Sequence, residues 1–224
     1  MKKLSLLVVC LAFFGFANAQ LANGSFAPNF HLFEINKTDG TIITTDTISL
    51  YNYTDAGKIV YMDIFATWCS PCFSYHSSHN LENLYTQYGP EGTNEVRVLG
   101  IEGSQGNYAS LSGTGVDAGG HASQGDWLTG VGYPVIPTAM APNTDAVCTD
   151  YAIAYFPTIY MVCPNRLVYE VGQQTTADLY ASKSTCPSFN NTLNNNALIV
   201  NGSGINGTYY CTANPTPTIT FQNV

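Results

Sequence analysis

Two stretches of apolar residues in the middle of the chain follow different patterns. Residues 58–65 are mostly Ile, Val, Tyr and Phe, which is typical of a strand buried on both faces of a sheet. After Ser70 the apolar residues recur every three or four positions, at Leu81, Leu84, Tyr85 and Tyr88. This second spacing predicts one helix, which Gly89 and Pro90 end.

Patterns of the same kind predict the secondary structure of most of the remaining chain. An antiparallel hairpin is predicted within 21–56, with its turn at Asp39-Gly40, and a buried strand at 95–102, parallel to 58–65. Further predicted elements are an extended segment at 133–137, a helix at 143–154 capped by Asn143 or Thr144, a hairpin of 158–163 with 167–171, and a last helix at 175–184. The resulting order is β-β-β-α-β-α-β-β-α.

Residues 103–132 are rich in Gly, Ser and Ala and show no helical pattern. Glycines can form a phosphate-binding loop, but the segment contains no complete glycine motif of that kind and no Lys or Arg. We interpret it as a long surface loop that shapes access to the candidate site described below.

Both ends of the chain differ from its middle. Residues 1–19 combine two lysines, an apolar run and Ala17-Asn18-Ala19, which predicts a signal peptide that is cleaved before Gln20 and removes Cys10. The apolar run is shorter than the roughly 20 residues of a spanning helix, so no transmembrane segment is expected. Residues 187–224 are rich in Asn and predict only short strands, either a β-rich tail or the start of a truncated immunoglobulin-like domain.

Composition narrows the functional classes. The formal net charge is −8, with 7 basic against 15 acidic residues, so nucleic acid is not an expected partner. The low content of charged residues, 10%, together with the predicted signal peptide, places the protein in the periplasm, at the cell surface or outside the cell.

The candidate catalytic residues lie where the strand predicted at 58–65 leads into the helix predicted after Ser70. Cys69 and Cys72 fall in the first helical turn, where unpaired N–H groups and the helix dipole stabilise a thiolate. Cys69 is therefore the predicted nucleophile and Cys72 the resolving thiol. Asp63 lies on the preceding strand, where an unpaired buried carboxylate is costly, and we assign it to proton transfer with Cys72.

These residues resemble the thioredoxin superfamily, in particular its exported TlpA-like thiol-disulfide oxidoreductases. The resemblance covers about residues 24–186 and rests on DIFATWCSPC from Asp63 to Cys72, on Ala27-Pro28-Asn29-Phe30 and on Phe156-Pro157-Thr158. It implies an α/β, thioredoxin-like three-layer fold with an N-terminal β-hairpin, to which the short β-rich tail is added. Tyr75 and Ser77 depart from the Glu and Pro that such exported proteins usually carry after the second cysteine.

The resemblance also implies roles for individual residues. Asp63 corresponds to the buried acid, Pro157 to a cis-proline facing the cysteine pair, and Trp68 to the tryptophan before the nucleophile. Substrate contacts are expected from Trp68, Phe156, Pro157 and Thr158. We expect no cofactor.

The function that follows is disulfide exchange with protein disulfide or dithiol substrates, together with a redox donor or acceptor protein. The exchange can run in either direction, and Pro71 beside the second cysteine and the resemblance favour reduction. Two other readings remain open. One is a secreted, non-catalytic adhesion or binding protein that keeps the cysteine pair as a structural disulfide. The other is a metal-binding chaperone, because Cys69, Cys72, His76 and His79 form C-x2-C-x3-H-x2-H. That spacing is unusual for zinc, so we expect no metal, and His31 and His121 have no visible partner.

Four further cysteines, Cys148, Cys163, Cys186 and Cys211, allow three pairings that spacing does not separate. The predicted order of strands and helices distinguishes between these three pairings. If Pro157 begins its strand beside the active site, Cys163 lies at the far end, and the last helix returns to that end at Cys186. This predicts a Cys163–Cys186 disulfide, with Cys148 and Cys211 as the residual pair.

Overall fold

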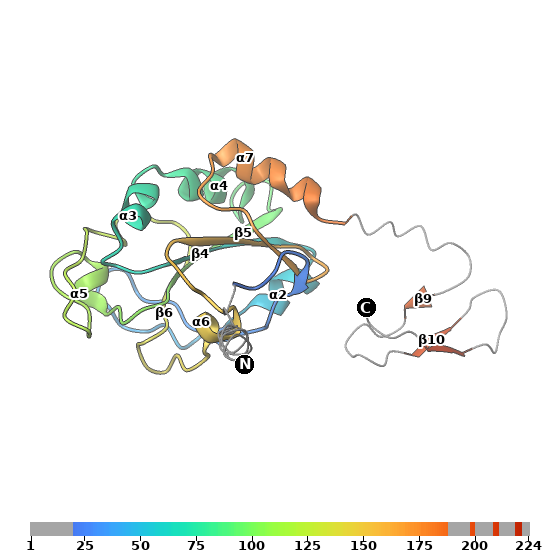
Figure 1. Ribbon diagram of the computed structural model, residues 1–224, viewed down its shortest axis with the longest axis horizontal. Helices are drawn as coiled ribbons and strands as arrows, with labels where there is room; N and C mark the ends of the chain where they lie inside the picture. Colours follow the sequence, from blue (N-terminus) through green and yellow to red (C-terminus); the bar gives the residue numbers. More distant parts are fainter. Residues whose placement is uncertain (1–19, 188–197, 200–207, 211–217, 221–224) are drawn as a thin grey trace, which may run out of the picture. The chain divides into compact units, whose positions relative to one another are not determined.

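The computed structural model describes residues 20–187 and the short segments 198–199, 208–210 and 218–220 (Figure 1). The chain divides into two compact units, with the boundary between Cys186 and Pro187. The predicted signal peptide, residues 1–19, and Cys211 lie outside the described residues.

A six-stranded sheet forms the centre of the first unit, in the order β1-β8-β7-β4-β5-β6. The strands are β1 (Ser25–Phe26), β4 (Ile59–Phe65), β5 (Val96–Glu102), β6 (Val135–Pro137), β7 (Thr158–Val162) and β8 (Leu167–Glu170). Strands β4, β5 and β6 run parallel, as the crossover connections between them require. β7 is antiparallel to β4, and β8 to β7.

Helices cover both faces of this sheet, so the unit has three layers (Figure 1). On one side lie α3 (Ser70–His76), α4 (Asn80–Tyr88) and α7 (Thr176–Ser182), followed by the 3₁₀ turn η2 (Lys183–Thr185). On the other side lie α2 (Leu50–Asp55) and α6 (Val147–Asp150). The short helix α5 (Tyr108–Leu111) belongs to the loop after β5.

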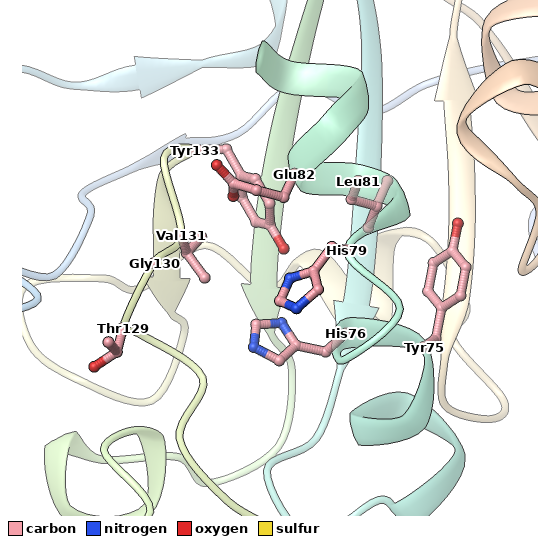
Figure 2. A pocket seen from close by; sticks show the side chains of 9 residues that line it. All are labelled: Tyr75, His76, His79, Leu81, Glu82, Thr129, Gly130, Val131 and Tyr133. Carbon is pink, nitrogen blue, oxygen red and sulfur yellow. The ribbon is translucent and has the colours of Figure 1, made fainter. Parts of the chain in front are cut away.

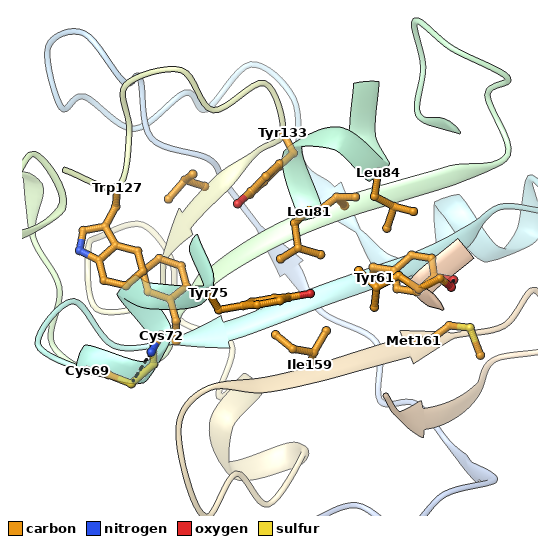
Figure 3. Packing of buried hydrophobic residues seen from close by; sticks show 14 of the residues in the cluster. Tyr61, Cys69, Cys72, Tyr75, Leu81, Leu84, Trp127, Tyr133, Ile159 and Met161 are labelled. Carbon is orange, nitrogen blue, oxygen red and sulfur yellow. Dashed lines mark hydrogen bonds between the residues drawn. A yellow bond between two sulfur atoms is a disulfide. The ribbon is translucent and has the colours of Figure 1, made fainter. Parts of the chain in front are cut away.

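The alternation of side chains along β4 divides the core into two clusters. Tyr61 and Phe65 belong to the cluster under α3, α4 and α7, whereas Met62 and Ile64 belong to the cluster on the opposite face. Because alternate residues of a strand share a face, Asp63 lies on the same side as Tyr61 and Phe65. Figure 3 shows the first cluster, with Cys69 and Cys72 at one end and Met161 at the other.

The long helix predicted after Ser70 is instead two helices. α3 ends at His76 and α4 begins at Asn80, and His79 between them has a left-handed φ of 57°. The carbonyl of Tyr75 accepts from the hydroxyl of Ser78 at 2.6 Å and from its N–H at 3.0 Å, while the N–H of His79 donates to the carbonyl of His76 instead. Local side-chain bonds of this kind compete with the helix and break it.

The N-terminal hairpin is shorter than predicted. β2 (His31–Leu32) pairs with β3 (Ile48–Ser49), and between them the only further pairing in the described chain is the bridge between Ile35 and Ile42. The last part of the predicted hairpin forms α2.

The helix predicted at 143–154 is also wrong in extent, because only α6 is helical there and Asn143 does not cap it. The Asn143 amide instead accepts from the N–H of Phe33 and donates to the carbonyls of Phe33 and Pro137.

A disulfide joins Cys163 to Cys186, with their Cα atoms 5.4 Å apart. Cys163 follows β7 and Cys186 follows η2, so this bond links the sheet to the end of α7. Cys148 forms no disulfide with a described residue, and its thiol donates to the carbonyl of Gly103 at 3.2 Å. The pairing of Cys148 with Cys211 stays a prediction, because Cys211 lies outside the described residues.

The second unit contains a three-stranded antiparallel sheet in the order β11-β10-β9. Its strands are β9 (Leu198–Ile199), β10 (Thr208–Tyr210) and β11 (Thr218–Thr220).

Candidate active site

The turn between β4 and α3 carries the cysteine pair. Cys69 has extended backbone dihedral angles and caps α3, because its Sγ accepts a hydrogen bond from the N–H of Cys72 at 3.2 Å. Pro71 occupies the first turn, where a backbone N–H would have no helical partner. The first turn of the helix thus directs a backbone donor at the sulfur of Cys69.

Cys69 and Cys72 form a disulfide, with their Cα atoms 5.3 Å apart (Figure 3). Cys69 is 5% exposed and Cys72 only 1%. Of the two sulfur-bearing residues, Cys69 is therefore the more open to an incoming thiol or disulfide.

Phe156 and Pro157 lie just before β7, and the peptide bond between them is cis. In the sheet register Thr158 pairs with Ile64, so Pro157 lies next to the carboxyl end of β4, from which the turn to Cys69 leaves. The side chain of Thr158 is fully buried and donates to the carbonyl of Tyr155 at 2.8 Å. Thr158 can therefore face a substrate only through its backbone.

Trp68 is a partly exposed aromatic residue directly before Cys69. Its side chain lies edge-on to Phe156, with ring centroids 6.1 Å apart, and its indole N–H donates to the Ser104 hydroxyl at 3.2 Å. At 38% exposure it presents an apolar face to solvent beside the disulfide. The structure thus places Trp68, the residue before Cys69, against Phe156, the residue before the cis-proline Pro157.

Asp63 is buried on the α3 side of β4. Within the part of the chain that the structure describes, no group hydrogen-bonds to its Oδ1. Burial raises the pKa of Asp63 to about 7. A carboxyl group with this pKa can take up or release a proton near neutral pH, as a proton-transfer residue must.

A second buried acid, Glu102, ends β5 and pairs in register with Phe65. Its Oε2 accepts from the N–H of Gly106 at 2.7 Å, while Oε1 has no partner among the described residues. Burial raises the pKa of Glu102 to about 7, although hydrogen bonds from Gly106, Ser104 and Thr67 act in the opposite direction. Glu102 was not among the residues predicted for the site, although it stands at the end of the buried strand predicted at 95–102.

Residues 103–132 are not only a surface loop. Trp127 is buried, and its ring stacks on Phe65 with centroids 4.5 Å apart and contacts Phe73 and His76. Gly125 lies so close to the ring of Phe73 that a side chain at this position would overlap it. This end of the loop therefore packs against α3. In the sequence, the presence of a tryptophan within a Gly- and Ser-rich segment was a feature that could have indicated this packing.

His76 and His79 line a small pocket between α3, α4 and the loop, together with Glu82 (Figure 2). Burial is the main cause that lowers the pKa of His76, and the neighbouring His79 lowers it further. Both oxygens of Glu82 accept from the N–H of Gly132. Within the described residues, no group of three or more His, Cys, Asp or Glu side chains could hold a metal ion.

His31 and His121, which had no visible partner in the sequence, both lie near an acid. His31 is 3.8 Å from Asp145, and His121 is 3.0 Å from Asp117. Asp117 is four residues before His121. This spacing indicates a contact only within a helix, and the segment shows no helical pattern.

Comparison with solved structures identifies the fold. The chain is similar to the thioredoxin domain of a thiol-disulfide oxidoreductase from Bacteroides vulgatus, with a TM-score of 0.50 and 17% identity over 74% of this chain and 97% of that chain. A thiol:disulfide interchange protein from Bacteroides sp. gives a TM-score of 0.49 and 15% identity over 78% of this chain and 96% of that chain. No family model and no curated protein matches the sequence. The first similarity, together with the sheet order, confirms the expected thioredoxin-like fold.

Proposed function

We propose that this protein is an exported thiol-disulfide oxidoreductase that exchanges disulfides with protein substrates. The observation that carries the proposal is the Cys69–Cys72 disulfide at the start of α3, directly after Trp68, whose ring contacts Phe156 before the cis-proline Pro157. The TlpA-like resemblance of the DIFATWCSPC segment supports the same class.

The reaction begins from the reduced protein. The Cys69 thiolate attacks one sulfur of a substrate disulfide, forms a mixed disulfide and releases the other substrate sulfur as a thiolate, which takes a proton from solvent. Asp63 then accepts the proton of Cys72, and the Cys72 thiolate attacks the Cys69 sulfur and expels the second substrate thiolate. This thiolate takes up a proton, and Asp63 returns its own proton to solvent. The products are a substrate dithiol and the Cys69–Cys72 disulfide.

Continued reduction of substrates needs a donor of two electrons. A redox protein with a dithiol supplies them by the same exchange in the reverse direction. Pro71 beside the second cysteine and the TlpA-like resemblance support the reductive direction. Trp68, Phe156 and Pro157 form the surface on which the substrate chain rests.

The proposal is tested by the reduction of insulin disulfides, with the reduction potential of the Cys69–Cys72 pair measured in a glutathione series. We expect turnover, and a potential within the range of redox-active pairs. No turnover with a potential far below about −300 mV would instead identify a structural disulfide and favour an adhesion or binding protein.

Export is the second part of the proposal, and residues 1–19 support it through their basic start, apolar run and small-residue cleavage site. Within the described residues, no helix has both the length and the apolar character to cross a membrane. N-terminal sequencing of protein recovered from outside the cytoplasm should begin at Gln20, and an intact N-terminus in the cytoplasm would contradict export.

A further inference from the structure

The loop after β5 contains a tight turn built around Asp117 and closed by a bridge between Val116 and Ala122. The Asp117 Oδ1 accepts from the N–H of Gly119 at 2.9 Å and from the N–H of His121 at 2.8 Å. Its two carboxylate oxygens also lie 3.1 and 3.0 Å from Nδ1 of the His121 ring. One buried carboxylate therefore fixes both the backbone of the turn and the imidazole.

The charge state of this pair follows from its surroundings. Burial acts to raise the pKa of Asp117, but hydrogen bonds from His121 and Gly119 outweigh it and hold the pKa below its ordinary value. The carboxylate is therefore ionised at neutral pH, and Nδ1 of His121 donates to it. This leaves Nε2 as the ring nitrogen available to another molecule, since it has no hydrogen-bond partner among the described residues.

The turn places this ring beside the active site. The His121 ring lies next to Trp68, with centroids 5.6 Å apart and the planes inclined by 48°. Trp68 has Phe156 on its edge and Cys69 as its neighbour in the chain. The exposed indole is thus flanked by His121 and by the residue before the cis-proline.

Backbone hydrogen bonds hold the loop in this position. The N–H of Gln124 donates to the carbonyl of Thr67 at 2.9 Å, which ties the loop to the turn that precedes Cys69. The N–H of Ala118 donates to the carbonyl of Gln105 at 2.9 Å. His121 is therefore attached to the same rigid frame as the cysteine pair.

A purely structural role does not account for the imidazole. The Asp117 turn is closed by two backbone N–H groups, which remain whatever side chain stands at position 121. The Asp117 side chain is fully buried, whereas that of His121 is 55% exposed. Gly119 also leaves room for the ring, because a Cβ there would come within 2.9 Å of Cε1 of His121. The buried carboxylate of Asp117 therefore serves to orient the exposed ring of His121.

We propose that His121 is a substrate-contacting residue, with Asp117 as its positioning residue: Nε2 hydrogen-bonds to the peptide chain of the substrate where that chain crosses Trp68 next to its reacting disulfide. This inference rests on the proposed function. It assigns part of the recognition of polypeptide substrates to the loop after β5, in addition to the surface formed by Trp68, Phe156 and Pro157.

The test compares two oxidants of the reduced full-length protein. One is a peptide with a disulfide to a second peptide, and the other is 2,2′-dithiodipyridine, a small neutral disulfide with no peptide chain. His121→Phe keeps an aromatic ring beside Trp68 but removes both nitrogens. Asp117→Asn keeps an acceptor for the backbone N–H groups but removes the charge. His31→Phe is the matched control, because His31 is another exposed histidine with an acidic neighbour, but on β2.

We expect His121→Phe to lower kcat/KM for the peptide disulfide about three- to tenfold, the usual value of one hydrogen bond, through a higher KM. The rate with 2,2′-dithiodipyridine should not change. Asp117→Asn should produce a smaller loss of the same kind, and His31→Phe none.

Two results would overturn the inference: an unchanged KM for the peptide in His121→Phe, or an equal loss with 2,2′-dithiodipyridine, which would mean that the ring acts on Cys69 itself. A wild-type protein that reacts with neither disulfide would refute the proposed function instead, before any variant is compared. Circular dichroism checks the fold of Asp117→Asn, and if that variant is unfolded, His121→Phe with its control decides the question alone.

Discussion

The N–H of Cys72 donates to the Sγ of Cys69 across 3.2 Å, within the first turn of α3. When the disulfide opens, this donor and the helix N-terminus favour the thiolate of Cys69. Cys72 is more deeply buried than Cys69, and Asp63 is a buried acid on the face of β4 that α3 covers. The two thiols of one motif are therefore chemically unequal, with attack assigned to the first and resolution to the second.

The first prediction follows from this inequality. Cys69→Ser should abolish the reduction of insulin disulfides, whereas Cys72→Ser should accumulate a mixed disulfide between Cys69 and the substrate. Mass spectrometry of the trapped species measures the result. Equal rates of alkylation of Cys69 and Cys72 in the reduced wild-type protein would count against the assignment.

The second prediction concerns proton transfer by Asp63, whose carboxyl has a pKa of about 7 because it is buried. Asp63→Asn should slow the resolution of the mixed disulfide by about 10²-fold, the lower end of what a general base contributes. It should change the initial attack by Cys69 much less. Rapid-mixing kinetics with a fluorescent peptide disulfide separates the two steps, and an unchanged resolution rate would remove Asp63 from the mechanism.

The third prediction uses the same carboxyl as a reporter of stability. Its pKa is raised from the ordinary value of 3.8 to about 7 in the folded protein, so the unfolded chain loses this proton first as the pH rises. Between about pH 4 and 7 the folded state binds more protons, and the wild-type protein loses stability as the pH rises through this window.

Asp63→Asn lacks this titration. The free energy of unfolding of the variant minus that of the wild type should therefore increase from pH 4 to pH 8, by about 2–4 kcal/mol. Urea unfolding of both oxidised proteins at the two pH values measures it. Glu102 also has a raised pKa, but it is present in both proteins and cancels in the difference. A difference that stays constant with pH would show that Asp63 is not desolvated as described.

Elements with strong periodicity could be predicted from the sequence. β4, β5, β7 and β8 correspond to runs of apolar residues in the sequence, and β4 places Asp63 and leads into the turn that carries Cys69. The start of α7 is set by the Thr175 cap, a local signal. Such features depend on neighbours in the chain, which the sequence displays directly.

The missed features depend on partners that are distant in sequence or on competition between side chain and backbone. The break at His79 depends on the Ser78 hydroxyl bonding to Tyr75, and the shortened α6 on Asn143 binding Phe33. The packing of Trp127 on Phe65 and of His121 on Trp68 joins a loop without periodicity to the site. No pattern of apolar spacing reports contacts of this kind.

The last prediction concerns the Cys163–Cys186 disulfide, which closes a loop across a sequence separation of 23 residues. A cross-link over a loop of this size restricts the unfolded chain and contributes about 3 kcal/mol on the chain-entropy model. The Cys163→Ala/Cys186→Ala double variant should therefore lose about 3 kcal/mol of unfolding free energy in urea, measured with the Cys69–Cys72 pair oxidised.

Activity should survive this loss. Pro157 precedes β7 and Cys163 follows it, so the length of the strand separates the cross-link from the active site. The α7 end remains attached by the Tyr61 hydroxyl, which donates to the carbonyl of Leu179, and by the stacking of Tyr180 on Tyr88. Insulin reduction well below the unfolding midpoint should thus match the wild type. A double variant as stable as the wild type would show that the cross-link does not restrict the unfolded chain, and loss of activity without unfolding would show that the far end of β7 is coupled to the cysteine pair.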